Sequence, residues 1–249
     1  MRLLQFSDTH LSGSPEIPVR GVATGETLAR CIAHAERSHP EPRAILLTGD
    51  LVHDDDTGYA ELCRLFADVG APVHCLPGNH DTAAAMRRGL DCAPFVHGFA
   101  HRHEGWLIVM LDSTVAGENH GHLPDQQLAR LDRVLAQEAG YYAIVCLHHH
   151  PVPHGSRWLD ELMLDNAPAL FAVLARHPRV RGLVWGHTHQ PLDRRQGEMR
   201  LMGTPSTCMQ FAQNADEFEV DTRPPAYRWF TLGEDGSMET GIEWVTTDG

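Results

Sequence analysis

The sequence predicts an α/β fold in which two packed β-sheets lie between outer layers of helices, a four-layer αββα sandwich. Two patterns support this prediction. Short apolar runs alternate with amphipathic helical segments over the first three quarters of the chain, and from Met199 onward the pattern is strand-rich without long helices. Because each sheet face must be covered by another layer, the late strands are expected to complete the sheets that the alternating part begins. The 249 residues and 42% hydrophobic content suit one large domain.

Apolar runs rich in β-branched residues predict the strands. Six lie in the alternating part of the chain, at Leu3–Phe6, Ala44–Leu47, Val73–Leu76, Leu107–Leu111, Ile144–Leu147 and Leu183–Trp185. Three more follow, at Met199–Met202, Tyr227–Leu232 and Ile242–Val245. The acidic segment Asp216–Pro225 ends in two prolines that disfavour strand pairing, so we expect a loop there.

Helices are predicted where apolar residues recur with helical spacing. Residues 27–36 place Leu28, Cys31, Ile32 and Ala35 on one face. The same spacing relates Leu62, Leu65, Phe66 and Val69, and later Leu128, Leu131, Val134 and Leu135. Pro124 and Gly140 flank the third of these segments and are typical start and stop signals.

The net charge of −13, from 20 basic and 33 acidic residues, argues against nucleic acid or an anionic membrane surface as a partner. No apolar run is long enough to cross a membrane. The first predicted strand begins at Leu3 without a preceding hydrophobic leader, so we expect a cytoplasmic protein. An anionic substrate would require a local positive centre, which bound metal ions would supply. Nothing in the sequence indicates the oligomeric state.

Cysteine and histidine are both frequent. The six cysteines form no C-x-x-C pair and lie mostly in apolar surroundings, so we expect reduced, buried thiols. Seven of the 18 histidines fall in the motifs described next, and we expect most of the other eleven at the surface. Histidine content alone therefore does not indicate a metal site.

Five short polar motifs each follow an apolar run, at the point where a buried strand would reach a loop. They are Asp8-Thr-His10, Gly49-Asp50, Gly78-Asn-His-Asp81, His148-His-His-Pro151 and Gly186-His-Thr-His189. Each has an ordinary explanation by itself: a polar strand end, a turn or an exposed histidine tract. Together they supply the carboxylate, amide and imidazole ligands that hold two metal ions side by side. In the third motif, Asp81 is expected to orient His80.

The order D-x-H, G-D, G-N-H-D, H-x-P, G-H-x-H resembles the calcineurin-like metallophosphoesterase superfamily, which implies the metallophosphoesterase fold. Further segments resemble the bacterial class III 3′,5′-cyclic AMP phosphodiesterases: His148–Pro151, Ser156–Asp160, Asn166–Ala167, Gly186–Gln190 and Thr204–Cys208. The resemblance covers a core of about residues 1–232 within a single domain of residues 1–249. The C-terminal tail, residues 233–249, is not diagnostic.

This resemblance implies the roles of the site residues. One metal would be held by Asp8, His10 and His189, and the second by Asn79, His149 and His187, with Asp50 bridging both. Among the three tandem histidines we choose His149, because the family ligand lies two residues before the proline; His148 and His150 would pack around it. Asp50 and His80 are the expected catalytic residues, His80 contacting the phosphate and donating a proton.

Substrate contacts are expected from the ligands and from a later loop, at Asn79, His80, His149, His189, Thr204 and Ser206. Relatives commonly carry a carboxylate shortly after the bridging aspartate. Here that stretch is His53-Asp54-Asp55, and the sequence leaves open which residue has this role.

The resemblance implies a phosphodiesterase that converts 3′,5′-cyclic AMP into 5′-AMP by attack of a hydroxide bridging two metals. Other small phosphodiesters, 2′,3′-cyclic nucleotides or phosphomonoesters are the alternative substrates. An inactive scaffold is disfavoured because all seven ligand positions are intact. The absence of a cysteine ligand favours iron or manganese, with cobalt and zinc also compatible.

Overall fold

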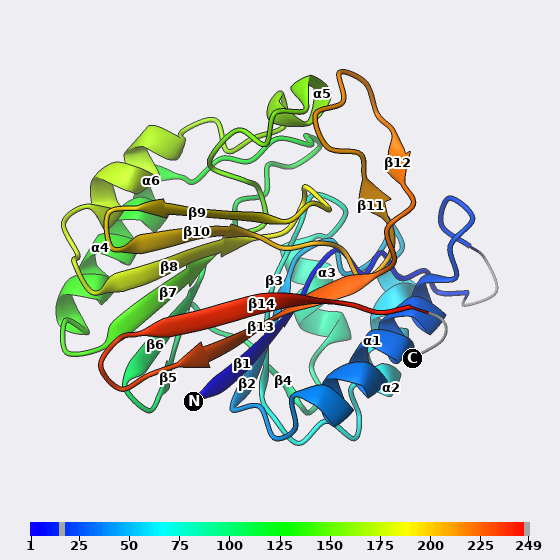
Figure 1. The fold of residues 1–249 in the computed structure, drawn as a ribbon, viewed down its shortest axis with the longest axis horizontal. Helices are drawn as coiled ribbons and strands as arrows, with labels where there is room; N and C mark the ends of the chain where they lie inside the picture. The colour runs from blue at the N-terminus through cyan, green and yellow to red at the C-terminus, as the bar shows by residue number, and fades with distance from the viewer. Residues whose placement is uncertain (15–17, 247–249) are drawn as a thin grey trace.

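A computed structural model describes residues 1–14 and 18–246. It contains two six-stranded sheets packed face to face, with helices on their outer sides (Figure 1). The predicted four-layer αββα architecture is therefore confirmed. Within the described residues, no helix is long and apolar enough to cross a membrane.

The first sheet has the order β14-β13-β1-β2-β3-β4. Four of its strands are parallel: β1 (Arg2–Phe6), β2 (Ala44–Thr48), β3 (Val73–Leu76) and β4 (Phe95–Val96). Two late strands extend it antiparallel, β13 (Ala226–Leu232) and β14 (Met238–Trp244). Much of the C-terminal tail is thus an edge strand of the domain, while its last three residues lie outside the described part.

The second sheet has the order β5-β6-β7-β8-β10-β9. Its parallel strands are β6 (Trp106–Met110), β7 (Tyr142–Cys146), β8 (Val180–Trp185) and β10 (Met199–Gly203). The edges are antiparallel, β5 (Ala100–His103) and β9 (Leu192–Gln196).

Three apolar layers separate the four structural layers. The first sheet packs on α1 (Thr24–Ser38), α2 (Tyr59–Leu65) and α3 (Ala83–Gly89). The second packs on α4 (Asp125–Gln137) and α6 (Ala167–Leu174). Between the sheets lie residues such as Leu46, Ile108 and Phe230. Because both faces of the central strands are buried, those strands are largely apolar, as the sequence shows.

Three expectations from the sequence are wrong in detail. Cys63 and Cys92 form a disulfide because α2 and the end of α3 lie side by side; the other four cysteines are free and buried. His74 is not at the surface but buried in β3. The segment expected as a loop contains β12 (Val220–Asp221), which pairs with β11 (Gln210–Phe211) in a small separate sheet.

Candidate metal centre

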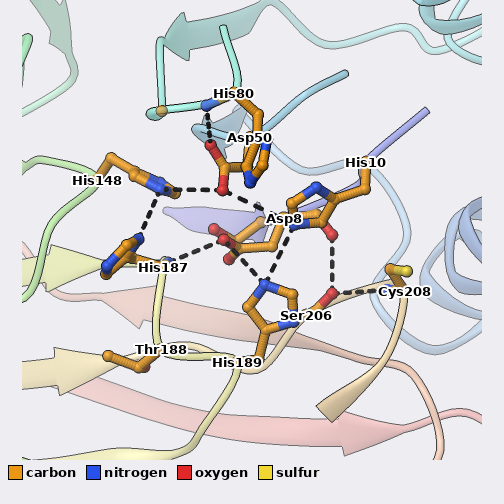
Figure 2. Close-up of polar contacts among 12 residues, drawn as sticks. Asp8, His10, Asp50, His80, His148, His187, Thr188, His189, Ser206 and Cys208 are labelled. Atoms are coloured by element: carbon orange, nitrogen blue, oxygen red, sulfur yellow. Dashed lines mark hydrogen bonds and ion pairs between the residues drawn. The ribbon is translucent and has the colours of Figure 1, made fainter. Parts of the chain in front are cut away.

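Residues of the five polar motifs lie together in one cluster (Figure 2). They follow β1, β2 and β3 in the first sheet and β7 and β8 in the second. Within each sheet these strands run parallel to one another, so their carboxyl ends meet at the same edge, where α/β proteins commonly bind ligands.

The backbone at this edge is unusual. Ten non-glycine residues of the described chain have positive φ, and five of them are predicted metal ligands: Asp8, His10, Asp50, His187 and His189. Such conformations cost about 1–3 kcal/mol each and persist where the surroundings hold them, often at functional sites. Gly49 also has positive φ, and a Cβ there would clash with the ring of His148.

The first ligand group consists of Asp8, His10 and His189. Nε2 of His189 lies 3.2 Å from Nε2 of His10 and 3.5 Å from Oδ1 of Asp8. Nδ1 of His189 lies 2.7 Å from the carbonyl oxygen of Met209. Since that carbonyl can only accept a hydrogen bond, Nδ1 carries the proton and the Nε2 lone pair faces the group.

The second group is centred on His148, whose Nε2 lies 3.2 Å from Oδ1 of Asn79 and 3.4 Å from Oδ2 of Asp50. The same atom is 3.2 Å from Nδ1 of His187 (Figure 2). Nδ1 of His148 is 2.8 Å from the carbonyl oxygen of Thr48, which can accept a hydrogen bond from the Nδ1–H group. His148 thus has the geometry of a metal ligand with a backbone partner on its other nitrogen.

His149, the residue chosen from the sequence, lies beside this convergence, with a ring nitrogen within 4.8 Å of ring nitrogens of His148 and His187, but it has no hydrogen bond or ion pair with Asn79 or Asp50. Its Nδ1 is 2.8 Å from the hydroxyl of Ser113, and its Nε2 is buried without a hydrogen-bond partner. The structure therefore brings His148 to the position that the sequence assigned to its neighbour. His150, expected to pack nearby, is buried with its Nε2 3.5 Å from Asp160.

Burial and the mutual contacts of these groups shift their pKa values. Burial raises the pKa of Asp8 to about 7. Burial also opposes ionisation of Asp50, but the charge and hydrogen bond of His148 hold the Asp50 pKa well below its usual range. Burial lowers the pKa of His148, but Asp50 more than offsets this and raises it to about 9. Burial lowers the pKa of His10, His187 and His189, in the last case to about 4.

These observations test whether the residues fit bound cations. Carboxylate and amide oxygens face imidazole lone pairs, and the buried Oδ2 of Asp8 and Nε2 of His187 have no hydrogen-bond partner. Buried acceptor atoms without a donor are unfavourable, and positive charge between them stabilises them; a bound cation would supply this charge, as a protonated His148 does without one. Asp50 contacts both groups, because its Oδ2 lies 3.7 Å from Nε2 of His10 and 3.4 Å from Nε2 of His148. The donor set fits two metal ions with Asp50 between them.

His80 lies at the outer side of this centre. Its backbone N–H donates to Oδ1 of Asp50, and its Nδ1 is 3.0 Å from Oδ2 of Asp54. Its ring stacks on His53, with ring centroids 4.8 Å apart. Asp54 is therefore the carboxylate that orients His80, whereas Asp55 accepts from the N–H groups of Gly13 and Thr57.

Asp81 does not orient His80, contrary to the sequence-based expectation. Its buried carboxylate accepts hydrogen bonds from the backbone N–H groups of Leu51 and Gly78 and from the hydroxyl of Tyr59. It connects the loop that carries Asp50 to the loop that carries Asn79. Its role here is to hold two ligand loops together.

Thr204 and Ser206 also differ from the expectation of substrate contact. Both are fully buried. The Thr204 hydroxyl donates to the side-chain oxygen of Gln5, and the Ser206 hydroxyl donates to the backbone carbonyl of Asp8. Ser206 thus supports the loop that carries Asp8 (Figure 2), and Thr204 binds a side chain of β1.

A pocket of about 230 Å³ opens beside the two groups. Asn79, His80 and His189 line it, and so do Arg20, Trp158, Phe211 and Phe218. The sequence did not identify Arg20, Phe211 or Phe218 as site residues, because no spacing pattern connects them to the motifs.

The sequence matches a known protein family and two curated proteins over most of its length. Residues 1–191 match the calcineurin-like phosphoesterase family. Two curated relatives are named 3′,5′-cyclic adenosine monophosphate phosphodiesterase CpdA. The Pseudomonas aeruginosa protein is 38% identical over 98% of this chain and 89% of its own length. The Escherichia coli K12 protein is 40% identical over 97% of this chain and 89% of its own length.

Solved structures with low sequence identity share the fold. A dimetal phosphatase from Danio rerio superimposes with a TM-score of 0.64 at 13% identity, covering 99% of both chains. GAP50 of Plasmodium, described as an anchor in the inner membrane complex, superimposes with a TM-score of 0.70 at 11% identity, covering 99% of this chain and 85% of its own. One architecture thus occurs in an enzyme and in an anchor, so function must be argued from the site.

Proposed function

Because this chain belongs to the calcineurin-like phosphoesterase family, we propose that it is a two-metal phosphodiesterase that hydrolyses 3′,5′-cyclic AMP to 5′-AMP. The observation that carries the proposal is the pair of ligand groups joined by Asp50 and open to a small pocket. The names of the relatives that match nearly the whole chain supply the substrate.

Asp8, His10 and His189 would hold one metal, and Asn79, His148 and His187 the other, with Asp50 bridging. We place His148 rather than His149 in this set because its Nε2 is the nitrogen that faces both Asn79 and Asp50. When bound, such a metal pair lowers the pKa of water and neutralises phosphate charge. We propose iron or manganese, since all donors are oxygen or nitrogen.

The charges of the site match the substrate. Asp8 and Asp50 are the two carboxylates among otherwise neutral donors, so two divalent ions would leave about two positive charges in excess. This excess suits a phosphodiester monoanion and overcomes the repulsion expected from a chain of net charge −13. His80 lines the pocket, and Asp54 binds its Nδ1, which leaves Nε2 as the nitrogen available to protonate the leaving 3′-oxygen.

A substrate panel tests this function. Protein reconstituted separately with manganese and with iron should be assayed with cyclic AMP, cyclic GMP, a 2′,3′-cyclic nucleotide and a phosphomonoester. Cyclic AMP should be turned over with the highest kcat/KM and should release 5′-AMP without 3′-AMP. A chiral phosphorothioate substrate in isotopic water should show inversion, because a single displacement occurs at phosphorus. Much faster turnover of phosphomonoesters would instead identify a phosphatase.

The proposal includes a cytoplasmic location and a small-molecule partner only. The strong negative charge disfavours nucleic acid and anionic membranes as partners.

A further inference from the structure

We propose that an aromatic wall formed by Trp158, Phe211 and Phe218 binds the base of the substrate, with Phe218 as the residue that decides whether a base is recognised. The inference rests on the proposed function, since the base belongs to the nucleotide cleaved at the same centre. The aromatic wall would make the enzyme select substrates by their base, which the proposed metal ligands cannot do because they would contact only the phosphate.

The wall begins on a proposed metal ligand. The ring of Phe211 stacks on the ring of His189, with centroids 3.9 Å apart and planes inclined by 13°. Trp158 and Phe218 both contact Phe211 edge-on, with ring centroids 5.4 Å and 5.2 Å from the Phe211 centroid. The ring centroids of Trp158 and Phe218 are 5.3 Å apart. A nucleotide whose phosphate lies at the metals would therefore have its base along this wall.

The three rings come from separate segments of the chain. Trp158 belongs to α5 (Arg157–Asp160), Phe211 to β11, and Phe218 to the connection between β11 and β12. In Figure 1 the small β11–β12 sheet and α5 lie at the same end of the sandwich. Phe211 also packs against a small apolar cluster of Val19, Cys208 and Met209, whereas Phe218 is not part of this cluster.

Phe218 is the exposed member of the wall. Its side chain is 42% exposed, and among the described residues only Val96 and Val220 are comparable exposed large hydrophobic residues. An exposed aromatic ring at the mouth of a pocket with converging polar groups is typical of a ligand site. Stacking of a base on an aromatic ring stabilises binding in nucleic-acid complexes and works for any base, since every base has a π-face.

Arg20 adds a polar contact to this wall. Its guanidinium carbon lies 4.6 Å from the centroid of the Phe218 ring. Within the described part of the chain, it is the only lysine or arginine that lines the pocket. The guanidinium donates hydrogen bonds and accepts none, so it matches the ring nitrogens of adenine, which are acceptors. Arg20 and Phe218 would thus hold the base by hydrogen bonding and stacking.

The test compares two substrates that differ only in the base. Wild type and Phe218→Ala should be assayed with cyclic AMP and with a ribose 3′,5′-cyclic phosphate that lacks a base. For Phe218→Ala, KM for cyclic AMP should rise by about tenfold, within the range of base–aromatic stacking, while kcat is maintained. KM for the base-free substrate should not change. An equal rise for both substrates would overturn the inference.

Two further variants separate recognition from structure. Phe218→Tyr should restore KM for cyclic AMP, because it keeps the ring. Val220→Ala removes a similarly exposed apolar side chain that does not line the pocket, and it should leave both substrates unaffected. If Val220→Ala matched Phe218→Ala, the effect would belong to the β11–β12 connection rather than to the ring.

Failure of the inference differs from failure of the proposed function. If wild type hydrolysed neither cyclic compound but cleaved phosphomonoesters, the function itself would be wrong. If wild type hydrolysed cyclic AMP and the base-free compound with equal kcat/KM, the function would stand and the base subsite would be excluded.

Discussion

At the scale of single residues, the tandem histidines illustrate how a ligand is chosen by geometry. Counting back from Pro151 favours His149, but the chain leaves β7 at Cys146 in a way that aims His148 at Asn79 and Asp50. Three adjacent histidines carry the same chemistry, so in the sequence only their distance from Pro151 distinguishes them. The contacts of Nε2 favour His148, because this nitrogen faces Asn79 and Asp50, whereas Nε2 of His149 has no hydrogen-bond partner.

His148→Ala should therefore remove the metal of the second group and abolish turnover, because a direct ligand is lost. His149→Ala should be milder and lower metal affinity by about 10–100-fold, the usual effect of losing a residue that supports ligands. Elemental analysis after dialysis against graded metal concentrations measures both. Asp50→Ala is the reference, since it should lower occupancy of both groups. Normal metal content in His148→Ala would return the ligand role to His149.

His80 and Asp54 form a second residue-scale prediction. His80→Ala should keep its metals while kcat falls by roughly 10²–10⁴, the range for loss of general acid catalysis. Asp54→Asn should cause a smaller loss, because the ring remains but its proton is less well placed. The loss in both variants should shrink with a nitrophenyl ester, whose leaving group needs no proton. An equal loss for good and poor leaving groups would indicate phosphate positioning instead.

At the scale of elements, the sequence predicted the central strands well and the edges poorly. β1, β2, β7 and β8 are buried on both faces, so their apolar runs are unmistakable. β9 was missed because only its first residue is buried. Helix α6 was missed because it is apolar on nearly all sides, and such a run lacks the one-sided periodicity of an amphipathic helix.

The packing of α2 against the ligand loops gives an element-scale prediction. The hydroxyl of Tyr59, in α2, donates to the buried Asp81 carboxylate at 2.7 Å. Tyr59→Phe should lower the free energy of unfolding by about 1–3 kcal/mol, because a buried acceptor loses a partner. Metal affinity should fall with it, since Asp81 joins two ligand loops. Urea unfolding measures the first effect. Tyr141→Phe, the same change at a half-buried position, is the control and should not alter metal affinity.

At the scale of the whole molecule, the sequence could predict that the five motifs meet, because all follow parallel strands of one sandwich. It could not predict the aromatic wall. Phe211 lies in the small β11–β12 sheet and Phe218 in the connection between its strands, and these segments look irregular in the sequence. Arg20 lies in the long connection that follows β1. Such contacts depend on how loops from both sheets fold over the common edge. Hydrophobic periodicity along the sequence predicts helices and strands but not the conformation of these loops.

The contact between the two sheets gives a final prediction, on pH. His74 in β3 is only 2% exposed. Its Nε2 lies 2.8 Å from Nε2 of His103, and its ring stacks on His101; both partners belong to β5 of the other sheet. Burial, followed by the charges of His101 and His103, lowers the pKa of His74 to about 3. In the unfolded chain a histidine has a pKa of about 6.5.

The unfolded state therefore takes up a proton at His74 as the pH falls below about 6.5, while the folded state takes it up only near 3. Stability must decrease across this window as the pH falls, by up to about 1.4 kcal/mol per pH unit for this residue. In metal-free protein, His74→Leu should flatten the slope of the unfolding free energy between pH 6 and pH 4.5 by about that amount. His97→Leu, at an exposed histidine that directly follows β4, controls for loss of an imidazole. If the slope of the unfolding free energy against pH were unchanged in His74→Leu, acid would destabilise the protein through groups outside this contact. His74 is the most deeply buried of its three histidines.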